Sequence, residues 1–165
     1  SGFCNDRSLS TQANNGDGVS LTGRDTNYAS VDRYRETYSP ILTCPNINND
    51  LFTTSVSEMG NNALTYPIGL ITADELVFAG LAAEYINKLS YTYSSSAYWT
   101  MTPSKFYGNG SYLSDVYYAP SDGLFGGNRV ISNMGVRGVI NLKGDVQISR
   151  GIGTANDPFV ISSAS

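Results

Sequence analysis

The sequence predicts an α+β fold with one main helix, over about residues 73–88, and a series of short, mostly antiparallel strands. Two observations carry this prediction. A helix-capping sequence precedes apolar residues at helical spacing, and short apolar segments separated by glycines follow from about residue 90. One helix in an irregular half, followed by a run of strands, is typical of the α+β class. The 165 residues, 41% of them hydrophobic, suit a single domain over residues 1–165.

The predicted helix begins at a capping box. In Thr72-Ala-Asp-Glu75, the Thr72 side chain can accept from the Glu75 amide, while the Glu75 side chain reaches back to the Thr72 amide. Apolar residues follow at positions 76, 79, 83 and 86, and Lys88 suits the negative end of the helix dipole. The apolar segment Leu64–Ile71, interrupted by proline and glycine, predicts a short, partly buried strand before the helix.

The chain before this strand is predicted to be mostly irregular. Residues 5–30 are rich in Asn, Gly, Ser and Thr and predict a loop, and residues 46–50 predict a turn. Residues 28–38 fit either a short helix or an extended segment, and residues 51–55 fit a short strand.

Strands dominate the second half of the prediction. Val136–Leu142 is interpreted as a central strand, followed by a hairpin turn at Lys143-Gly144. The predicted strands are 97–102, 115–119, 129–133, 136–142, 145–149 and 158–161.

Charge and composition exclude several classes of function. The net charge is −4, the pI is near 4.6, and the ten Lys and Arg residues are scattered. The basic face that nucleic acid or an anionic membrane surface needs is therefore absent. The chain has no histidine, which excludes Ser-His-Asp and Cys-His catalysis and removes the commonest zinc ligand. We expect no enzyme activity, no catalytic residues, no cofactor and no metal.

The same composition indicates the compartment. Only 15% of the residues are charged, so the surface is polar but weakly charged, which fits an extracellular or cell-surface protein. No apolar run approaches the roughly 20 residues of a membrane span. Because the sequence begins abruptly at Ser-Gly-Phe-Cys, we expect any export signal or anchor to lie upstream of residue 1.

Cys4 and Cys44 are the two cysteines, and two interpretations of them are open. In a polar, lightly charged domain the pair predicts one disulfide, which would close a loop of about 40 residues. On the loop-entropy model this disulfide stabilises the fold by on the order of 4 kcal/mol. In a cytosolic protein the two residues would instead be buried free thiols.

Five segments carry a resemblance that spans nearly the whole chain: Phe3–Arg7, Tyr66–Glu75, Tyr98–Pro103, Gly135–Leu142 and Gly153–Ile161. They resemble motifs of bacterial secreted and pilin-like surface proteins with a C-type-lectin-like domain. This group is related to formylglycine-generating enzymes and to the variable proteins of diversity-generating retroelements. The resemblance implies a C-type-lectin-like fold displayed on a surface or pilus. One departure is Gly138, where the pattern has proline.

Two activities known in this fold do not transfer to this chain. Formylglycine generation uses a reactive cysteine pair late in the chain, whereas no cysteine follows Cys44. Calcium-dependent sugar binding uses Glu-Pro-Asn or Gln-Pro-Asp together with Trp-Asn-Asp. None of these three tripeptides is present, and Trp99 is followed by Thr100-Met101.

Residues 105–133 are the predicted ligand-binding region. Thirteen of these 29 residues are Tyr, Asn, Ser or Asp. Tyrosine gives large contact area with few rotors, and Ser and Asn give adaptable hydrogen bonds, as in antibody paratopes. The resemblance implies that this part of the fold carries the displayed face of the variable proteins. The alternative is an ordinary polar loop with half-buried tyrosines. The candidate ligand-binding residues are Tyr107, Asn109, Tyr112, Asp115, Tyr117, Tyr118, Asp122 and Asn128.

Other candidates have structural explanations that we favour. Trp99 and the tyrosines at 91, 93 and 98 could stack on sugar rings, but the Trp99 motif is structural in the family and we expect Trp99 in the core. The Asp74–Glu75 pair could perform acid–base chemistry, but the capping box explains it. Arg137 is expected to form an ion pair or to cap carbonyls. A loose structural calcium site is an alternative at residues 14–18 or 46–50, although the EF-hand spacing is absent.

The sequence thus predicts a non-enzymatic, extracellular ligand-binding or adhesion module on a bacterial surface or pilus. Its expected partners are a host or bacterial surface protein or a glycan, and not nucleic acid. The alternative is a structural, pilin-like subunit that self-associates in a filament without a specific ligand.

Overall fold

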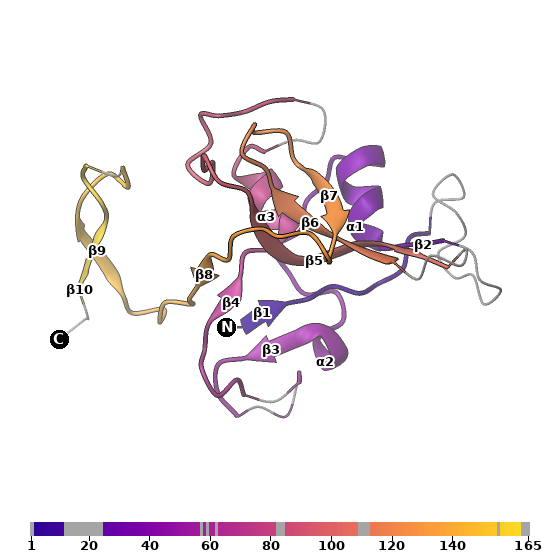
Figure 1. The fold of residues 1–165 in the computed structure, drawn as a ribbon. Helices are drawn as coiled ribbons and strands as arrows, with labels where there is room; N and C mark the ends of the chain where they lie inside the picture. Colours follow the sequence, from indigo (N-terminus) through magenta and orange to yellow (C-terminus); the bar gives the residue numbers. More distant parts are fainter. Residues whose placement is uncertain are drawn as a thin grey trace.

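The computed structural model describes residues 2–11, 25–56, 58, 60–61, 63–81, 85–108, 113–154 and 156–162. These residues form short helices and mostly antiparallel strands, so the predicted α+β class is confirmed (Figure 1). No helix among them has the length and apolar character needed to span a membrane. The elements are β1 Gly2–Cys4, β2 Thr26–Asn27, α1 Ala29–Val31, the π-helical η2 Asp32–Glu36, α2 Ile47–Asp50, β3 Leu51–Thr53, β4 Gly69–Leu70, α3 Ala73–Phe78, β5 Tyr98–Tyr107, β6 Leu113–Ala119, β7 Gly126–Arg129, β8 Gly138–Val139, β9 Gln147–Arg150 and β10 Val160–Ser162.

A four-stranded antiparallel sheet in the order β2-β5-β6-β7 organises the molecule. Inward and outward side chains alternate along β5, and its inward residues are Tyr98, Thr100, Thr102 and Ser104. This period of two is what a strand with one covered face requires. The α1, η2 and α3 segments cover the inward face of the sheet (Figure 1).

An aromatic cluster forms the centre of the core. The Tyr34 ring meets the Tyr117 and Phe125 rings edge-on, at centroid distances of 5.1 and 5.5 Å, and Tyr117 stacks on Phe125 at 5.0 Å. Edge-on and stacked aromatic pairs of this kind stabilise the fold beyond the contribution of apolar burial. The core residues are Val31, Tyr34, Ala73, Leu76, Leu81, Tyr98, Tyr117, Ala119 and Phe125.

In the described part of the chain, three two-stranded antiparallel sheets lie outside the main sheet: β1 with β3, β4 with β8, and β9 with β10. Cys4, at the end of β1, forms a disulfide with Cys44, with a Cα–Cα distance of 5.5 Å. The predicted disulfide is confirmed, and the free-thiol alternative is wrong.

The main helix is shorter than the predicted 73–88. Its capping box is present as predicted, but α3 ends at Phe78. Gly80 has a left-handed φ of 97°, its amide donates to the Val77 carbonyl, and the Leu81 amide donates to the Leu76 carbonyl. This pair of bonds is the Schellman arrangement that terminates helices at a glycine. The helical spacing of apolar residues continues past Gly80 in the sequence, but the helix itself ends at Phe78.

The predicted central strand, Val136–Leu142, is also wrong. This segment contributes only β8, which pairs with β4 outside the main sheet. Its side chains Val136, Ile140 and Leu142 are 74%, 65% and 50% exposed, because β5 and β6 occupy the centre of the main sheet. The turn at Lys143 is present, with the Val146 amide donating to its carbonyl. Its flanking segments do not pair, however, since β9 pairs with β10.

Candidate functional site

The predicted residues 105–133 do not form one continuous face, and Tyr117 is the clearest exception. Tyr117 is 3% exposed, and its side chain belongs to the aromatic core. Burial raises the pKa of its hydroxyl, so the ring stays neutral. The prediction that Tyr117 contacts a ligand is therefore wrong. The alternation along β6 places Tyr117 inward and Tyr118 outward.

Tyr107 and Asp115 lie together at one end of β5 and β6. The Tyr107 hydroxyl donates to Asp115 Oδ2 at 3.0 Å, and Lys105 Nζ lies 4.5 Å from the centre of the Tyr107 ring. Lys105 also forms an ion pair with Asp25, at 3.0 Å. Burial and the hydrogen bond to Asp115 raise the pKa of Tyr107. The Tyr107 hydroxyl and Asp115 Oδ2 are thus bonded to each other, whereas the buried Asp115 Oδ1 has no hydrogen-bond partner among the described residues.

Tyr118 lies near the other end of β6, paired with Trp99 across the strands. The two rings meet edge-on at 6.3 Å, on the face of the sheet opposite the core. Trp99 is half-buried, so the prediction that it belongs to the core is wrong, and Tyr98 takes that place. Burial and the charge of Asp122 raise the pKa of Tyr118.

Asp122, in a turn, and Asn128, on β7, each accept a hydrogen bond from a nearby backbone amide. Asp122 Oδ1 accepts from the Leu124 amide at 2.9 Å, and Asn128 Oδ1 accepts from the Arg129 amide at 2.8 Å. Asn109 and Tyr112 lie outside the described residues. Apart from the buried Tyr117, the described candidates thus separate into a Tyr107–Asp115 pair, Tyr118, Asp122 in a turn and Asn128 on β7.

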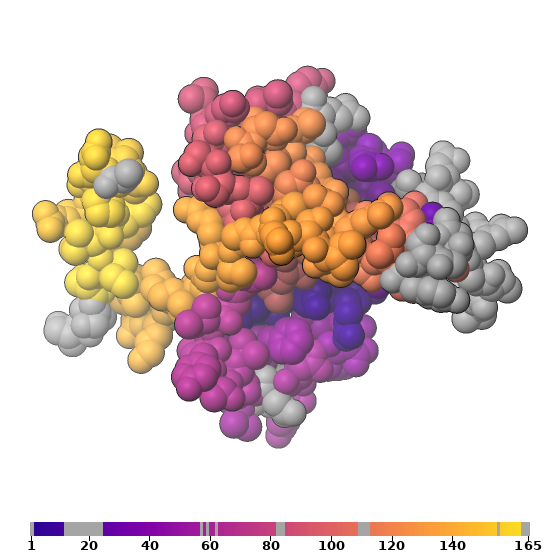
Figure 2. All heavy atoms as spheres, in the orientation of Figure 1, coloured from indigo at the N-terminus to yellow at the C-terminus, as the bar shows by residue number. Residues whose placement is uncertain are grey.

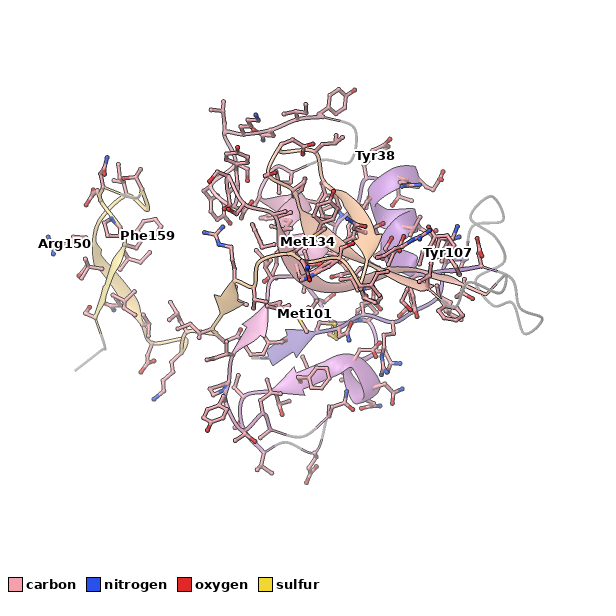
Figure 3. The ribbon with its side chains drawn as sticks, viewed as in Figure 1. Tyr38, Met101, Tyr107, Met134, Arg150 and Phe159 are labelled. Atoms are coloured by element: carbon pink, nitrogen blue, oxygen red, sulfur yellow. A yellow bond between two sulfur atoms is a disulfide. The ribbon has the colours of Figure 1, made fainter. Side chains whose placement is uncertain are left out.

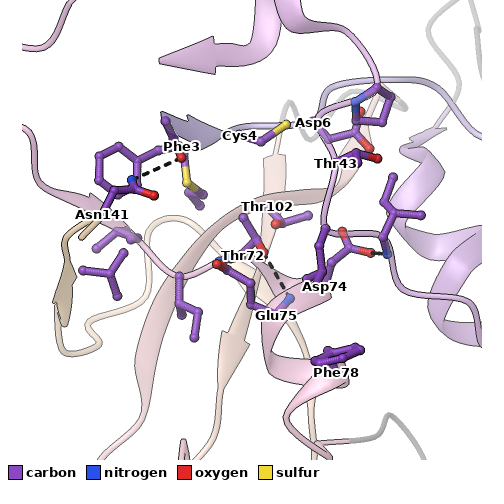
Figure 4. A pocket seen from close by; sticks show the side chains of 18 of the residues that line it. Phe3, Cys4, Asp6, Thr43, Thr72, Asp74, Glu75, Phe78, Thr102 and Asn141 are labelled. Atoms are coloured by element: carbon purple, nitrogen blue, oxygen red, sulfur yellow. Dashed lines mark hydrogen bonds between the residues drawn. The ribbon is translucent and has the colours of Figure 1, made fainter. Parts of the chain in front are cut away.

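A pocket of 350 Å³ lies elsewhere, between the N-terminal segment, α3, β5 and the chain around β8. Its floor includes Thr102, whose hydroxyl accepts from the Ala73 amide at 2.9 Å and so positions the start of α3. Phe78 of α3 and Asn141 beyond β8 enter from opposite sides (Figure 4). The Asn141 side chain donates to the Gly2 carbonyl at 3.3 Å, which ties the two chain segments together.

Arg33 binds the two buried carboxylates of this pocket. Its Nη2 lies 2.9 Å from Asp6 Oδ2, and its Nε and Nη2 donate to the two Asp74 oxygens at 2.9 Å each. Burial alone would lower the pKa of Arg33, but the hydrogen bonds and charge of Asp74 outweigh it and raise that pKa. Asp74 Oδ1 also accepts from the Ile41 amide at 2.9 Å.

Glu75, the remaining carboxylate at the pocket, is part of the capping box. Its Oε2 accepts from the Thr72 amide at 2.7 Å and from the Thr72 hydroxyl at 2.9 Å. The structural interpretation of the Asp74–Glu75 pair therefore agrees with the hydrogen bonds that both residues make. Three carboxylates against one guanidinium leave the pocket a formal net charge of −2.

The rim of the pocket is apolar and open to solvent. Its residues Leu42, Phe78, Tyr91 and Ile140 are 63%, 71%, 82% and 65% exposed. We call these four residues the rim. Large exposed apolar side chains around a concave site are typical of binding surfaces. The pocket and its rim offer aromatic and aliphatic contacts above an acidic floor.

The described part of the chain contains no group of three or more His, Cys, Asp or Glu residues placed to bind a metal ion. At the possible calcium site of residues 46–50, Asp50 instead accepts from the Arg7 amide and side chain, at 3.0 and 2.7 Å. Residues 14–18 lie outside the described residues.

Arg137 donates to the Thr92 carbonyl at 3.4 Å, so the predicted carbonyl-capping role is confirmed.

Of the rim, the sequence analysis named only Tyr91, as a possible sugar-stacking residue, because the four residues come from four separate segments. One signal was present. Phe78 follows Leu76 by two positions and so falls off the apolar stripe of the helix, which places a large ring toward solvent.

Comparison with known proteins adds no assignment: no family model, no curated protein and no solved structure matches this chain.

Proposed function

We propose that this chain is a non-enzymatic, extracellular binding module whose ligand contacts the rim and enters the pocket. The observation that best supports this proposal is the contrast between the exposed rim and the buried acidic side chains beneath it. The rim side chains are more than 60% exposed, whereas the buried acidic side chains beneath them are bonded to Arg33 or to backbone amides. Such a site has contact area to offer a ligand, while its carboxylates already have structural roles.

Display outside the cell is supported by the disulfide. Disulfides persist in oxidising compartments and are rare in the cytosol. The Cys4–Cys44 bond also connects β1 to the segment that contributes Leu42 to the rim, so it stabilises the site itself. We infer that the protein acts at a bacterial surface or on a pilus, with a surface protein or a glycan as its ligand class.

A C-type-lectin-like fold is part of the proposal. Its support lies in where the motif segments fall. Tyr66–Glu75 provides β4 and the start of α3, Tyr98–Pro103 begins the long strand β5, and Gly135–Leu142 provides β8. The motifs thus build the parts of the fold that position the pocket, which accounts for their structural character.

Binding to arrays of glycans and of surface proteins tests the proposed function. We expect the wild-type chain to give hits that the Phe78→Ala/Tyr91→Ala variant loses. A Tyr38→Ala variant is the matched control, since Tyr38 is 62% exposed but does not line the pocket, and it should keep the hits. Tyr118→Ala tests the predicted 105–133 region in parallel. Hits that survive loss of the rim residues but disappear with Tyr118→Ala would move the site to that region.

A structural filament subunit is the second candidate function, and one observation favours it. The C-terminal hairpin of β9 and β10 projects from the rest of the chain with its apolar side chains exposed (Figure 2). Filaments in electron micrographs of the purified chain that persist in the Phe78→Ala/Tyr91→Ala variant, together with arrays that give no hit, would support this function over the binding module.

A further inference from the structure

The C-terminal hairpin is a well-defined structural unit. Its tip is held by the Asp157 carbonyl, which accepts from the amides of Ile152, Gly153 and Thr154 at 3.2, 3.0 and 3.2 Å. Gly151 and Gly153 have left-handed φ angles of 92° and 80°, and a Cβ at Gly151 would lie 2.0 Å from the Pro158 carbonyl oxygen. Glycine adopts these left-handed angles without steric cost, so the turn requires it at both positions. The tip of the hairpin is thus held by backbone hydrogen bonds and by two glycines.

The side chains of this hairpin nevertheless lack a covering surface. Ile148, Ile152, Phe159 and Ile161 are 61%, 72%, 55% and 50% exposed. Among the described elements, β9 and β10 make their extensive contacts with each other, and the hairpin stands apart from the rest of the molecule (Figure 2). An isolated two-stranded hairpin is marginally stable in water at best. Its apolar side chains therefore favour docking against another apolar surface.

The rim and pocket complement the hairpin in both polarity and charge. The rim supplies aromatic and aliphatic side chains, and the pocket beneath has a formal net charge of −2. The hairpin carries Arg150, which forms no ion pair with the described residues. A pocket of 350 Å³ admits a few side chains and not a whole hairpin, so the hairpin would insert side chains and lie across the rim.

The orientation of the hairpin favours a second copy of the chain over the hairpin's own pocket. Ile140 and Asn141 line the pocket, and the chain leaves it there before β9 begins at Gln147. Arg150 lies on the side of the hairpin that faces away from the rest of its own chain (Figure 3). The cationic side chain is thus presented to a neighbouring molecule.

We propose that the hairpin of one copy docks on the rim of a second copy, with Arg150 directed at the acidic floor of the pocket and the isoleucines against Phe78 and Tyr91. This inference rests on the proposed binding role of the pocket and names its partner. The hairpin and the pocket are different surfaces of the chain, so the contact is head-to-tail and can repeat along a row of molecules.

Sedimentation velocity of the purified full chain over a wide concentration range tests this contact. We expect the wild type to form dimers and longer species as its concentration rises. The hairpin variant Ile148→Ser/Ile152→Ser and the rim variant Phe78→Ser/Tyr91→Ser should each associate roughly 100-fold more weakly, because each loses two large apolar contacts. All four side chains are more than 60% exposed, so both variants should keep the wild-type melting temperature.

Mixing the two variants gives the decisive result. The hairpin variant keeps an intact rim and the rim variant keeps an intact hairpin, so their mixture should form one-to-one dimers and nothing longer. A mixture that stays monomeric would overturn the proposal, as would a wild type that stays monomeric because the hairpin folds onto its own pocket. Association lost in the hairpin variant but kept in the rim variant would also overturn it. A wild type that stays monomeric but gives rim-dependent array hits would overturn this contact while leaving the proposed function intact.

Discussion

Arg33 and Asp74 form a two-point ion pair, with Nε–Oδ1 and Nη2–Oδ2 distances of 2.9 Å each, which joins η2 to the first turn of α3. Both side chains are mostly buried, at 11% and 7% exposed. The same guanidinium holds Asp6 of the N-terminal segment. One residue thus connects three segments that all line the pocket.

Removing the Asp74 carboxylate should destabilise the fold strongly. In Asp74→Asn, the buried Arg33 keeps only Asp6 as a charged partner and the Ile41 amide loses a carboxylate acceptor. Loss of one partner of a buried pair costs about 3 kcal/mol. Urea unfolding measures this change, and Lys105→Ala, which breaks an ion pair with Asp25 whose two side chains are 28% and 31% exposed, is the control with a smaller loss. A change below about 0.5 kcal/mol in Asp74→Asn would contradict the structural role of the pair.

A side chain at Gly80 should destabilise the fold. Its φ of 97° is in the left-handed region, where an L-residue costs about 1–2 kcal/mol. We expect Gly80→Ala to lower the free energy of unfolding by about that amount. Gly144→Ala is the matched control, since its φ is not left-handed and a Cβ there would meet no atom within 4 Å. Equal stabilities for the two variants would argue that α3 does not end as described.

Stability should fall at alkaline pH because of Tyr34. Burial, followed by the charge of Asp74, raises the pKa of Tyr34 above its model-peptide value of about 10. Above pH ~10 the unfolded chain therefore releases the phenolic proton while the folded chain retains it, and stability decreases by up to about 1.4 kcal/mol per pH unit for this group. Tyr34→Phe removes this proton and should make the decline shallower in urea titrations above pH ~10. An unchanged slope would show that Tyr34 titrates normally.

Reduction of the Cys4–Cys44 disulfide should lower the melting temperature. The bond closes a loop with a sequence separation of 40, for which chain entropy predicts on the order of 4 kcal/mol. Thermal unfolding with and without a reductant measures the effect, and the Cys4→Ser/Cys44→Ser variant, which has no disulfide to reduce, should not respond to the reductant. No shift in the wild type would contradict the contribution of this bond.

The features predicted correctly from the sequence are those determined by neighbouring residues. The capping box needs only Thr72 and Glu75, three positions apart, and it is present. The end of α3 was missed because the apolar spacing continues beyond Gly80, although a glycine at that position is itself a stop signal. The disulfide prediction rested on cysteine count and composition, which were sufficient for a single pair.

The candidate site could not be predicted in the same way. Whether Tyr117 or Tyr118 points outward depends on the register of β6, and a shift of one residue exchanges the two faces. The rim assembles from chain segments around residues 42, 78, 91 and 140, which only the tertiary fold brings together. Composition drew attention to the tyrosines of 105–133, but Tyr117 is buried and the Tyr107 hydroxyl donates to Asp115.

The most direct test of the proposed binding site is one array that carries glycans, surface proteins and the chain itself. Wild type and the Phe78→Ala/Tyr91→Ala variant are applied side by side at equal concentration. The account predicts hits for the wild type, with the chain itself among them, and their loss in the variant. Identical hits for the two proteins would contradict a binding site at the rim.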